Sequence, residues 1–218
     1  MSPGVVTTIK WVFHVGQYAW AIPALCGLIK WNKSAVGAKL LTILVIVGFL
    51  VEEFMSIYED TLLLSQLMFR IYTIIEFGMI TAYFITITKL PRIRRVMYYL
   101  SILILPIAIF DYLMGGPTER DDLTIGVESL IFVGYCIVVL YNTLKEGEHE
   151  RITSTSSFWA ISAILIYFGA NIFVFISSNY VRSISLESSQ ILWTVHEVFN
   201  IIFYFILAVA LWKAKDSH

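Results

Sequence analysis

Residues 190–212 read QILWTVHEVFNIIFYFILAVALW, an apolar run that carries His196, Glu197 and Asn200 near its beginning. A transmembrane helix needs about 20 mostly apolar residues to cross the hydrocarbon core of a bilayer, and this run is long enough. As a helix, it places His196 and Asn200 one turn apart on one face, with Glu197 beside them. The run therefore predicts a membrane-spanning helix, and it raises the question of why so apolar a segment carries three polar side chains.

The composition of the whole chain places it in the membrane class. Its 218 residues are 58% hydrophobic and 14% charged, whereas a soluble domain is near half apolar and a quarter charged. The net charge is −1, and the sequence has no basic stripe of the kind that neutralises phosphates, so nothing indicates nucleic-acid binding. Cys26 and Cys136 lie in apolar runs, which indicates buried side chains rather than a disulfide framework.

Six further apolar stretches satisfy the same length criterion, and the connections between them are short. The seven predicted spans are residues 11–29, 39–55, 62–87, 96–114, 123–143, 157–177 and 190–212. Pro23 and Pro106 fall inside the first and fourth spans, where we expect each to kink its helix. The sequence therefore predicts an all-α polytopic integral membrane protein, with a single seven-helix transmembrane domain over residues 1–218.

The distribution of lysine and arginine predicts the orientation of the spans, because cytoplasmic loops carry an excess of both residues. Eleven of them lie in the first, third and fifth loops and the C-terminal tail, against three in the N-terminus and the other loops. The larger set is Lys30, Lys33, Lys39, Lys89, Arg92, Arg94, Arg95, Lys145, Arg151, Lys213 and Lys215; the smaller set is Lys10, Arg120 and Arg182. We therefore predict that the N-terminus is outside and the C-terminus is cytoplasmic.

Ionisable residues inside the spans lie in the outer half of this predicted bundle and near its midplane, whereas the inner halves contain none. An ionisable residue within a membrane is costly, so it should face the bundle interior, paired or hydrated. We therefore predict a polar cavity that opens outward above an apolar floor. Its predicted wall consists of Glu53, Arg70, Glu76, Glu128, Asn171, His196, Glu197 and Asn200, with Gln17, Tyr72 and Tyr167 as further hydrogen-bonding groups.

The charges of this predicted cavity are unbalanced. Six carboxylates face one permanent cation, Arg70, which we expect to pair with Glu76 or Glu53. The six are Glu52, Glu53, Glu76, Asp111, Glu128 and Glu197. Either several of them are protonated, or a cationic ligand compensates them.

Two plainer interpretations stay open. Side chains in the end turns of a span, such as those of Glu52, Asp111 and His14, can extend to headgroups and water. Arg70 lies too deep for this, but a buried pair between Arg70 and a carboxylate can simply hold the bundle together.

The same polar residues suggest a metal site as an alternative, because histidine with carboxylates suits zinc, manganese or iron. The candidate ligands are His196, Glu197, Glu53 and His14, although no HExxH spacing occurs. A haem between His14 and His196 is disfavoured, because lone histidines are more often polar core residues than axial ligands. Retinal is excluded, because its Schiff base needs a lysine inside the membrane and no span has one away from its ends.

The sixth and seventh spans, FWAISAILIYFGANIFVF and LWTVHEVFNIIFYFILAVALWKAK, resemble the end of bacterial seven-helix sensory modules that often precede histidine kinases. The resemblance implies a sensor in a bacterial inner membrane. Because no output domain follows the seventh span in this sequence, we expect signalling through a separate cytoplasmic partner. We therefore predict a receptor-like module whose outward-facing, acid-rich cavity binds a small or cationic ligand. The alternatives are a transporter, a metal-dependent intramembrane enzyme that uses the same His/Glu cluster, or a structural subunit.

Overall fold

The computed structural model describes residues 2–58, 61–116, 122–145 and 152–214, and these ranges contain helices and no strands. Eight α-helices are described: α1 (Pro3–Ala19), α2 (Ala21–Lys30), α3 (Val36–Ile57), α4 (Leu62–Ile87), α5 (Pro91–Gly115), α6 (Asp122–Lys145), α7 (Ser156–Ile184) and α8 (Leu186–Trp212). Two short 3₁₀ turns, Trp31–Lys33 and Ile152–Ser154, follow α2 and precede α7. Arg120, Arg151 and Lys215, which entered the charge comparison, lie outside the described residues.

The described helices supply seven segments that are long and apolar enough to cross a membrane, as the sequence predicts. The first segment, Pro3–Lys33, joins α1 and α2, which are separated at Trp20. Pro23 accounts for this break, because it has no N–H to donate to the carbonyl four residues earlier and its ring crowds that carbonyl. In contrast, α5 continues through Pro106. The seven segments indicate an integral membrane protein.

The sixth and seventh segments extend further than the sequence predicts. The serine-rich stretch between residues 177 and 190 has the composition of a loop, yet α7 continues to Ile184 and α8 begins at Leu186. Ser178 donates a hydrogen bond to the carbonyl of Phe175, so its polar group is satisfied inside the helix. Ser185 is the N-cap of α8, and its hydroxyl accepts a hydrogen bond from the backbone N–H of Ser188 at 3.0 Å.

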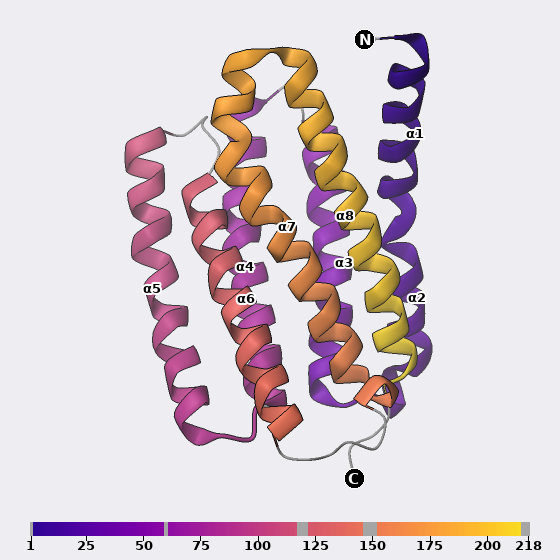
Figure 1. Ribbon diagram of the computed structural model, residues 1–218, viewed down its shortest axis with the longest axis vertical. Helices are drawn as coiled ribbons and strands as arrows, with labels where there is room; N and C mark the ends of the chain where they lie inside the picture. Colours follow the sequence, from indigo (N-terminus) through magenta and orange to yellow (C-terminus); the bar gives the residue numbers. More distant parts are fainter. Residues whose placement is uncertain (1, 59–60, 117–121, 146–151, 215–218) are drawn as a thin grey trace.

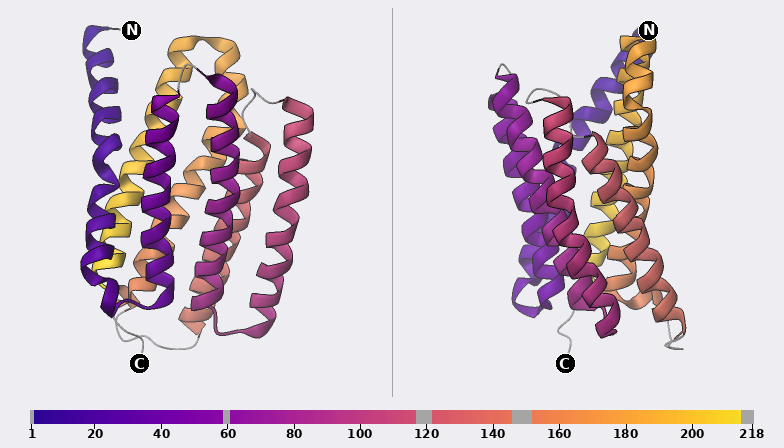
Figure 2. Two further views of the ribbon diagram at one scale, coloured as in Figure 1. Left: turned by 180° about the vertical axis from the view of Figure 1, so that it is seen from behind. Right: turned by 90° about the vertical axis from the view of Figure 1, so that its left-hand side faces the viewer.

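The helices pack side by side as a bundle, in which α1 begins at one end and α8 ends at the other (Figure 1). The helix α8 packs against α7 on one side and against α1 and α2 on the other, and α7 also packs against α6. The helix α5 contacts α4 and α6 at the edge of the bundle (Figure 2). The bundle interior is therefore formed mainly by α3, α4, α6, α7 and α8.

Aromatic side chains form the centre of the core. The ring of Phe132, fully buried on α6, stacks on Phe77 of α4 at 5.1 Å and meets Phe168 of α7 edge-on at 4.7 Å. Large apolar side chains also cover the outside of the bundle, for example Phe173 and Leu113, which are 76% and 72% exposed. Soluble proteins rarely expose extended apolar surface to water. This apolar exterior is instead suited to contact with lipid.

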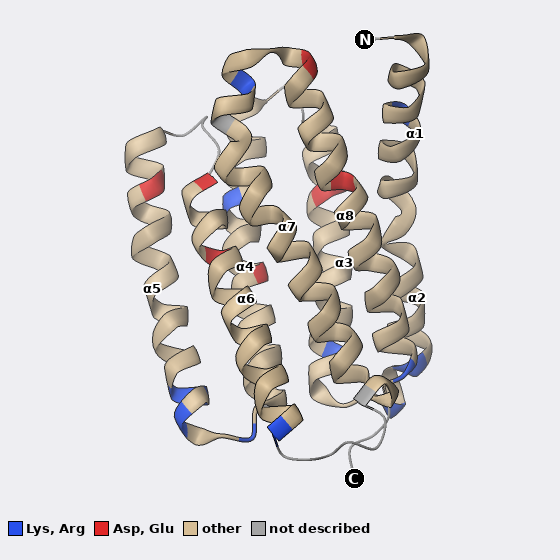
Figure 3. Ribbon diagram, viewed as in Figure 1, with Lys and Arg blue, Asp and Glu red and all other residues tan. Residues whose placement is uncertain are grey.

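Acidic and basic residues separate along the bundle axis (Figure 3). The described aspartates and glutamates lie between the end where α1 begins and the middle of the bundle, and we call this part the acidic half. Most described lysines and arginines gather at the opposite end, which we call the basic end. The candidate site lies in the acidic half.

Candidate functional site

A cavity of about 220 Å³ lies between α3, α4, α7 and α8. Polar groups share its wall with apolar and aromatic side chains. The lining residues are Leu44, Val45, Gly48, Val51, Glu52, Met55, Phe69, Tyr72, Glu76, Tyr167, His196, Glu197, Asn200, Phe203 and Tyr204. Among the described residues that line it, three are glutamates and none is lysine or arginine.

Helical periodicity explains how α8 contributes to this wall. His196, Asn200 and Tyr204 follow one another at intervals of four residues, so they lie on one face of the helix. Phe203 belongs to the same face and closes the apolar side of the cavity. The sequence predicts that His196 and Asn200 share one face of the helix. These two residues begin a longer stripe that faces the cavity.

A glycine on α3 lets a tyrosine of α4 lie close to the α3 backbone. A Cβ atom at Gly48 would lie 2.9 Å from the hydroxyl oxygen of Tyr72, which is tighter than ordinary van der Waals contact. The same hydroxyl donates a hydrogen bond to Oε1 of Glu76 at 3.4 Å. Gly48 therefore makes room for the tyrosine that contacts one of the cavity carboxylates.

A second glycine makes room for the carboxylate of Glu197. A Cβ atom at Gly16 of α1 would lie only 1.7 Å from Oε1 of Glu197, so the carboxylate occupies the space that a side chain would fill. Glu197 is 9% exposed, and Asn200 lies close enough to interact with it. The carboxylate is thus held at the junction of α1, α8 and the cavity.

The imidazole of His196 is held by a hydrogen bond and by aromatic rings. Its Nδ1 lies 3.0 Å from Oδ1 of Asn171 on α7, and which atom donates depends on the tautomer. The rings of Tyr167, Phe175 and Trp193 lie with their centroids 5.6–5.8 Å from that of His196. Asn171 does not line the cavity itself, but it orients a side chain that does.

Four predicted wall residues line the cavity, namely Glu76, His196, Glu197 and Asn200, and Asn171 adjoins it. Three others are elsewhere. Glu53 is outside the lining, where its neighbour Glu52 takes the place expected for it, and Glu128 is buried on α6. Arg70 donates a hydrogen bond to the carbonyl oxygen of Gly116 at 3.1 Å. Its expected pairing with Glu76 or Glu53 stays a prediction.

The cavity wall also contains Glu52, Phe203 and Tyr204, which are not among the wall residues that the sequence predicts. The interval of four residues from Asn200 to Tyr204 is a usable signal, because it continues the stripe that begins at His196. For Glu52 no such signal exists, because neighbouring glutamates on an apolar helix do not reveal which one faces inward. Gln17, expected as a further hydrogen-bonding group, is exposed on α1.

The candidate metal ligands are dispersed. His14 is exposed, and its ring contacts Trp11 and Tyr18 of its own helix. The described part of the chain has no group of three or more histidine, cysteine, aspartate or glutamate side chains arranged to hold a metal ion. Binding of a metal at His196 and Glu197 would therefore need side chains to rearrange.

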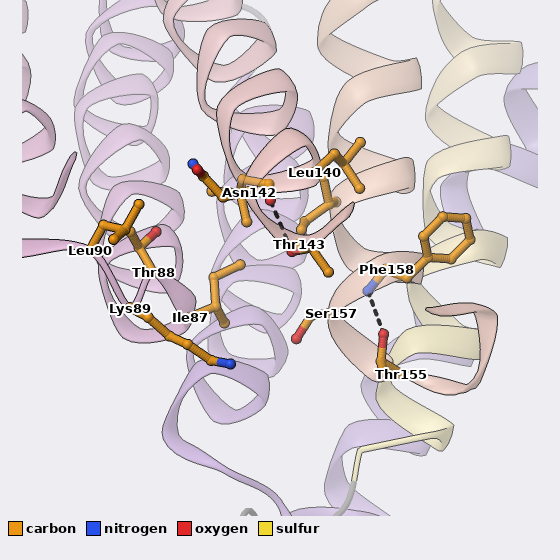
Figure 4. Close-up of a pocket in the computed structure, with 12 residues that line it drawn as sticks. Ile87, Thr88, Lys89, Leu90, Leu140, Asn142, Thr143, Thr155, Ser157 and Phe158 are labelled. Atoms are coloured by element: carbon orange, nitrogen blue, oxygen red, sulfur yellow. Dashed lines mark hydrogen bonds between the residues drawn. The ribbon is translucent and has the colours of Figure 1, made fainter. Parts of the chain in front are cut away.

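Another cavity, of about 170 Å³, lies at the basic end between α4, α6 and α7 (Figure 4). Three of its hydroxyl groups take part in hydrogen bonds of the helices themselves. Thr88 and Thr143 donate to carbonyl oxygens of their own helices, and Thr155 accepts from the backbone N–H of Phe158 at the beginning of α7. The cavity in the acidic half instead gathers three glutamates and a histidine, so we take it as the candidate functional site.

Comparison with known proteins finds no matching family model, no matching curated protein and no matching solved structure. Three carboxylates beside aromatic rings, without lysine or arginine in the described lining, favour a positively charged occupant.

Proposed function

We propose that the chain is a receptor-like membrane module that binds a small cationic ligand in the acidic cavity and signals to a separate partner in the cytoplasm. The observation that carries the proposal is the presence of Glu52, Glu76 and Glu197 in one cavity whose described lining has no lysine or arginine. Ionised carboxylates inside a membrane protein need positive charge or water nearby. A dissociable cation supplies that charge.

The distribution of lysine and arginine supports an orientation for this receptor. Lys30, Lys33, Lys89 and Arg92 belong to the basic end, and the positive-inside rule assigns such an end to the cytoplasm. The acidic half then faces outward, and the resemblance to sensory modules implies a bacterial inner membrane. Glu52 is exposed on α3 and also lines the cavity, so ligands would enter past it.

The helix α8 supports the signalling part of the proposal, because it connects the cavity with the basic end. Its first half carries His196 and Glu197, whereas its last residue, Trp212, lies under the ammonium group of Lys30 at 4.6 Å. Ser156 at the beginning of α7 donates a hydrogen bond to the carbonyl oxygen of Ala210 at 2.8 Å. A shift of α8 on ligand binding would therefore change contacts at the end that faces the partner.

Cysteine accessibility tests the cavity and its orientation together. In a background with both native cysteines replaced, we would introduce Glu52→Cys or Glu76→Cys and add a membrane-impermeant thiol reagent from the outside of intact cells. We expect both introduced cysteines to react. Gly78→Cys is the control that should not react, because Gly78 lies on an exposed face of α4 outside the cavity. If neither cavity position reacts, the outward-facing cavity is wrong. Cation flux across proteoliposomes would instead indicate a transporter.

A further inference from the structure

The chemistry of the cavity wall specifies the kind of cation, and this inference rests on the proposed function. We infer that the ligand is an organic ammonium ion, held by the cavity carboxylates and by aromatic rings. The two candidate classes, organic ammonium ions and metal ions, differ in what they require of a site. A metal ion needs several ligand atoms at about 2.0–2.6 Å in a defined arrangement, whereas an alkylammonium ion fits apolar and aromatic surfaces that carry a nearby negative charge.

Three of the aromatic rings in the wall adjoin one another, and two more lie on α4. The ring of Tyr167 lies 5.0 Å from that of Phe203, which lies 5.5 Å from that of Tyr204. Phe69 and Tyr72 line the cavity from α4. Aromatic rings attract cations within about 6 Å of the ring centroid, most strongly when water is excluded. The wall therefore offers favourable contact both to an alkyl group and to the charge that it carries.

The carboxylates supply the opposite charge. Glu197 is nine-tenths buried, lines the cavity, and has the amide of Asn200 as its polar neighbour. Glu52 and Glu76 reach the same cavity from α3 and α4. Tyr204 lines the cavity together with all three carboxylates. A cation beside Tyr204 would therefore interact with carboxylates from three helices at once.

The arrangement is less suited to a metal ion. The described residues contain no group of three or more side chains that could chelate one. Much of the wall consists of apolar side chains such as Leu44, Val45 and Phe203, which cannot replace the water around a metal ion. An organic ammonium ion is weakly hydrated along its carbon atoms, so the same side chains favour its entry.

Binding of butylammonium to the purified full-length protein tests the inference. The probes are butylammonium and tetramethylammonium, compared with uncharged 1-butanol and with Mg²⁺ and Mn²⁺, and binding is measured by isothermal titration calorimetry in detergent. We expect both ammonium ions to bind, 1-butanol to bind at least about tenfold more weakly, and the metal ions not to compete. Glu197→Gln should weaken butylammonium binding by about tenfold or more.

Tyrosine variants test the aromatic contribution. Tyr204→Leu removes the ring and should weaken binding by about tenfold, whereas Tyr204→Phe keeps the ring and should change affinity less. Phe205→Leu is the matched control, because Phe205 is the next residue of α8, is 50% exposed and lies outside the lining. Equal losses for Tyr204→Leu and Phe205→Leu would overturn the aromatic part of the inference. Far-ultraviolet circular dichroism shows whether each variant is folded.

The remaining outcomes separate this inference from the proposed function. Suppose that Mn²⁺ or Mg²⁺ binds, that Glu197→Gln weakens this binding, and that neither ammonium ion binds. The inferred ligand class is then wrong, but the proposed cation receptor is not contradicted. If no cation binds, or if 1-butanol binds as tightly as butylammonium, both the ligand class and the cation receptor are wrong.

Discussion

Replacing Gly16 with alanine would put a methyl group where the carboxylate of Glu197 lies. The added Cβ atom would be 1.7 Å from Oε1 and 2.6 Å from Cδ of that side chain, so the carboxylate would have to move. Overpacking of this kind costs about 1–3 kcal/mol. Alanine in place of glycine inside a helix returns about 0.5–1 kcal/mol. We therefore expect the free energy of unfolding to fall by roughly 0–2.5 kcal/mol.

A double-mutant cycle separates two effects of Gly16→Ala, namely the clash with Glu197 and the higher helix propensity of alanine. In a Glu197→Ala background the obstructing atoms are absent, so Gly16→Ala should stabilise the protein by about 0.5–1 kcal/mol. The interaction energy between the two sites should then be about 1–3 kcal/mol. Gly78→Ala on α4 is the matched control, because no atom lies within 4 Å of its added Cβ atom. It should have the same small effect in both backgrounds.

Unfolding in detergent, followed by the helical signal in circular dichroism, measures each of these variants. The measurement needs no ligand, so it tests the position of Glu197 independently of any proposal about function. If Gly16→Ala changes the free energy of unfolding equally with and without the Glu197 side chain, the carboxylate does not lie against α1. The description of the cavity on the α1 side would then be wrong.

Two further substitutions test the core and the acidic half by the same unfolding assay. Phe132→Ala should lower the free energy of unfolding by about 3–5 kcal/mol, because the ring of Phe132 is fully buried. Phe173 is 76% exposed, so Phe173→Ala should have a much smaller effect. Similar losses for the two variants would contradict the described core. Thr124→Val removes one of two hydrogen bonds to Oδ2 of Asp111 and should cost about 1.5–3 kcal/mol. Thr8→Val, whose hydroxyl is exposed, should change stability by less than about 0.5 kcal/mol, and an equal loss there would refute the role of Thr124.

The seven spans could be predicted because each is a long apolar run, and hydrophobicity over such a length needs no tertiary information. The ends of the sixth and seventh spans could not be predicted as well. Serine-rich sequence resembles a loop, but serine hydroxyls can bond to backbone groups within or at the end of a helix, as those of Ser178 and Ser185 do. Composition therefore located the hydrophobic centres of these helices better than their ends.

The part of the site on α8 could be predicted because its polar residues interrupt an otherwise apolar helix at helical spacing. The part on α3 could not. Glu52 and Glu53 are neighbours, about 100° apart around the helix, and the apolar residues around them allow either to face inward. Their assignment depends on how α3 is rotated against α4 and α8, which is a property of the packed bundle. Arg70 likewise contacts Gly116 at the end of α5, which no spacing in the sequence indicates.

The acidic half contains carboxylates in two kinds of surroundings. Asp111 accepts hydrogen bonds from the backbone and the hydroxyl of Thr124, so it joins α5 to α6 and has a structural explanation. Glu52, Glu76 and Glu197 converge on one cavity, where such charges tend to repel each other. Buried charges that serve only packing can often be replaced by apolar residues without loss of stability. Packing alone therefore explains the buried carboxylate of Glu197 poorly, whereas the cationic ligand that we propose would supply the opposite charge.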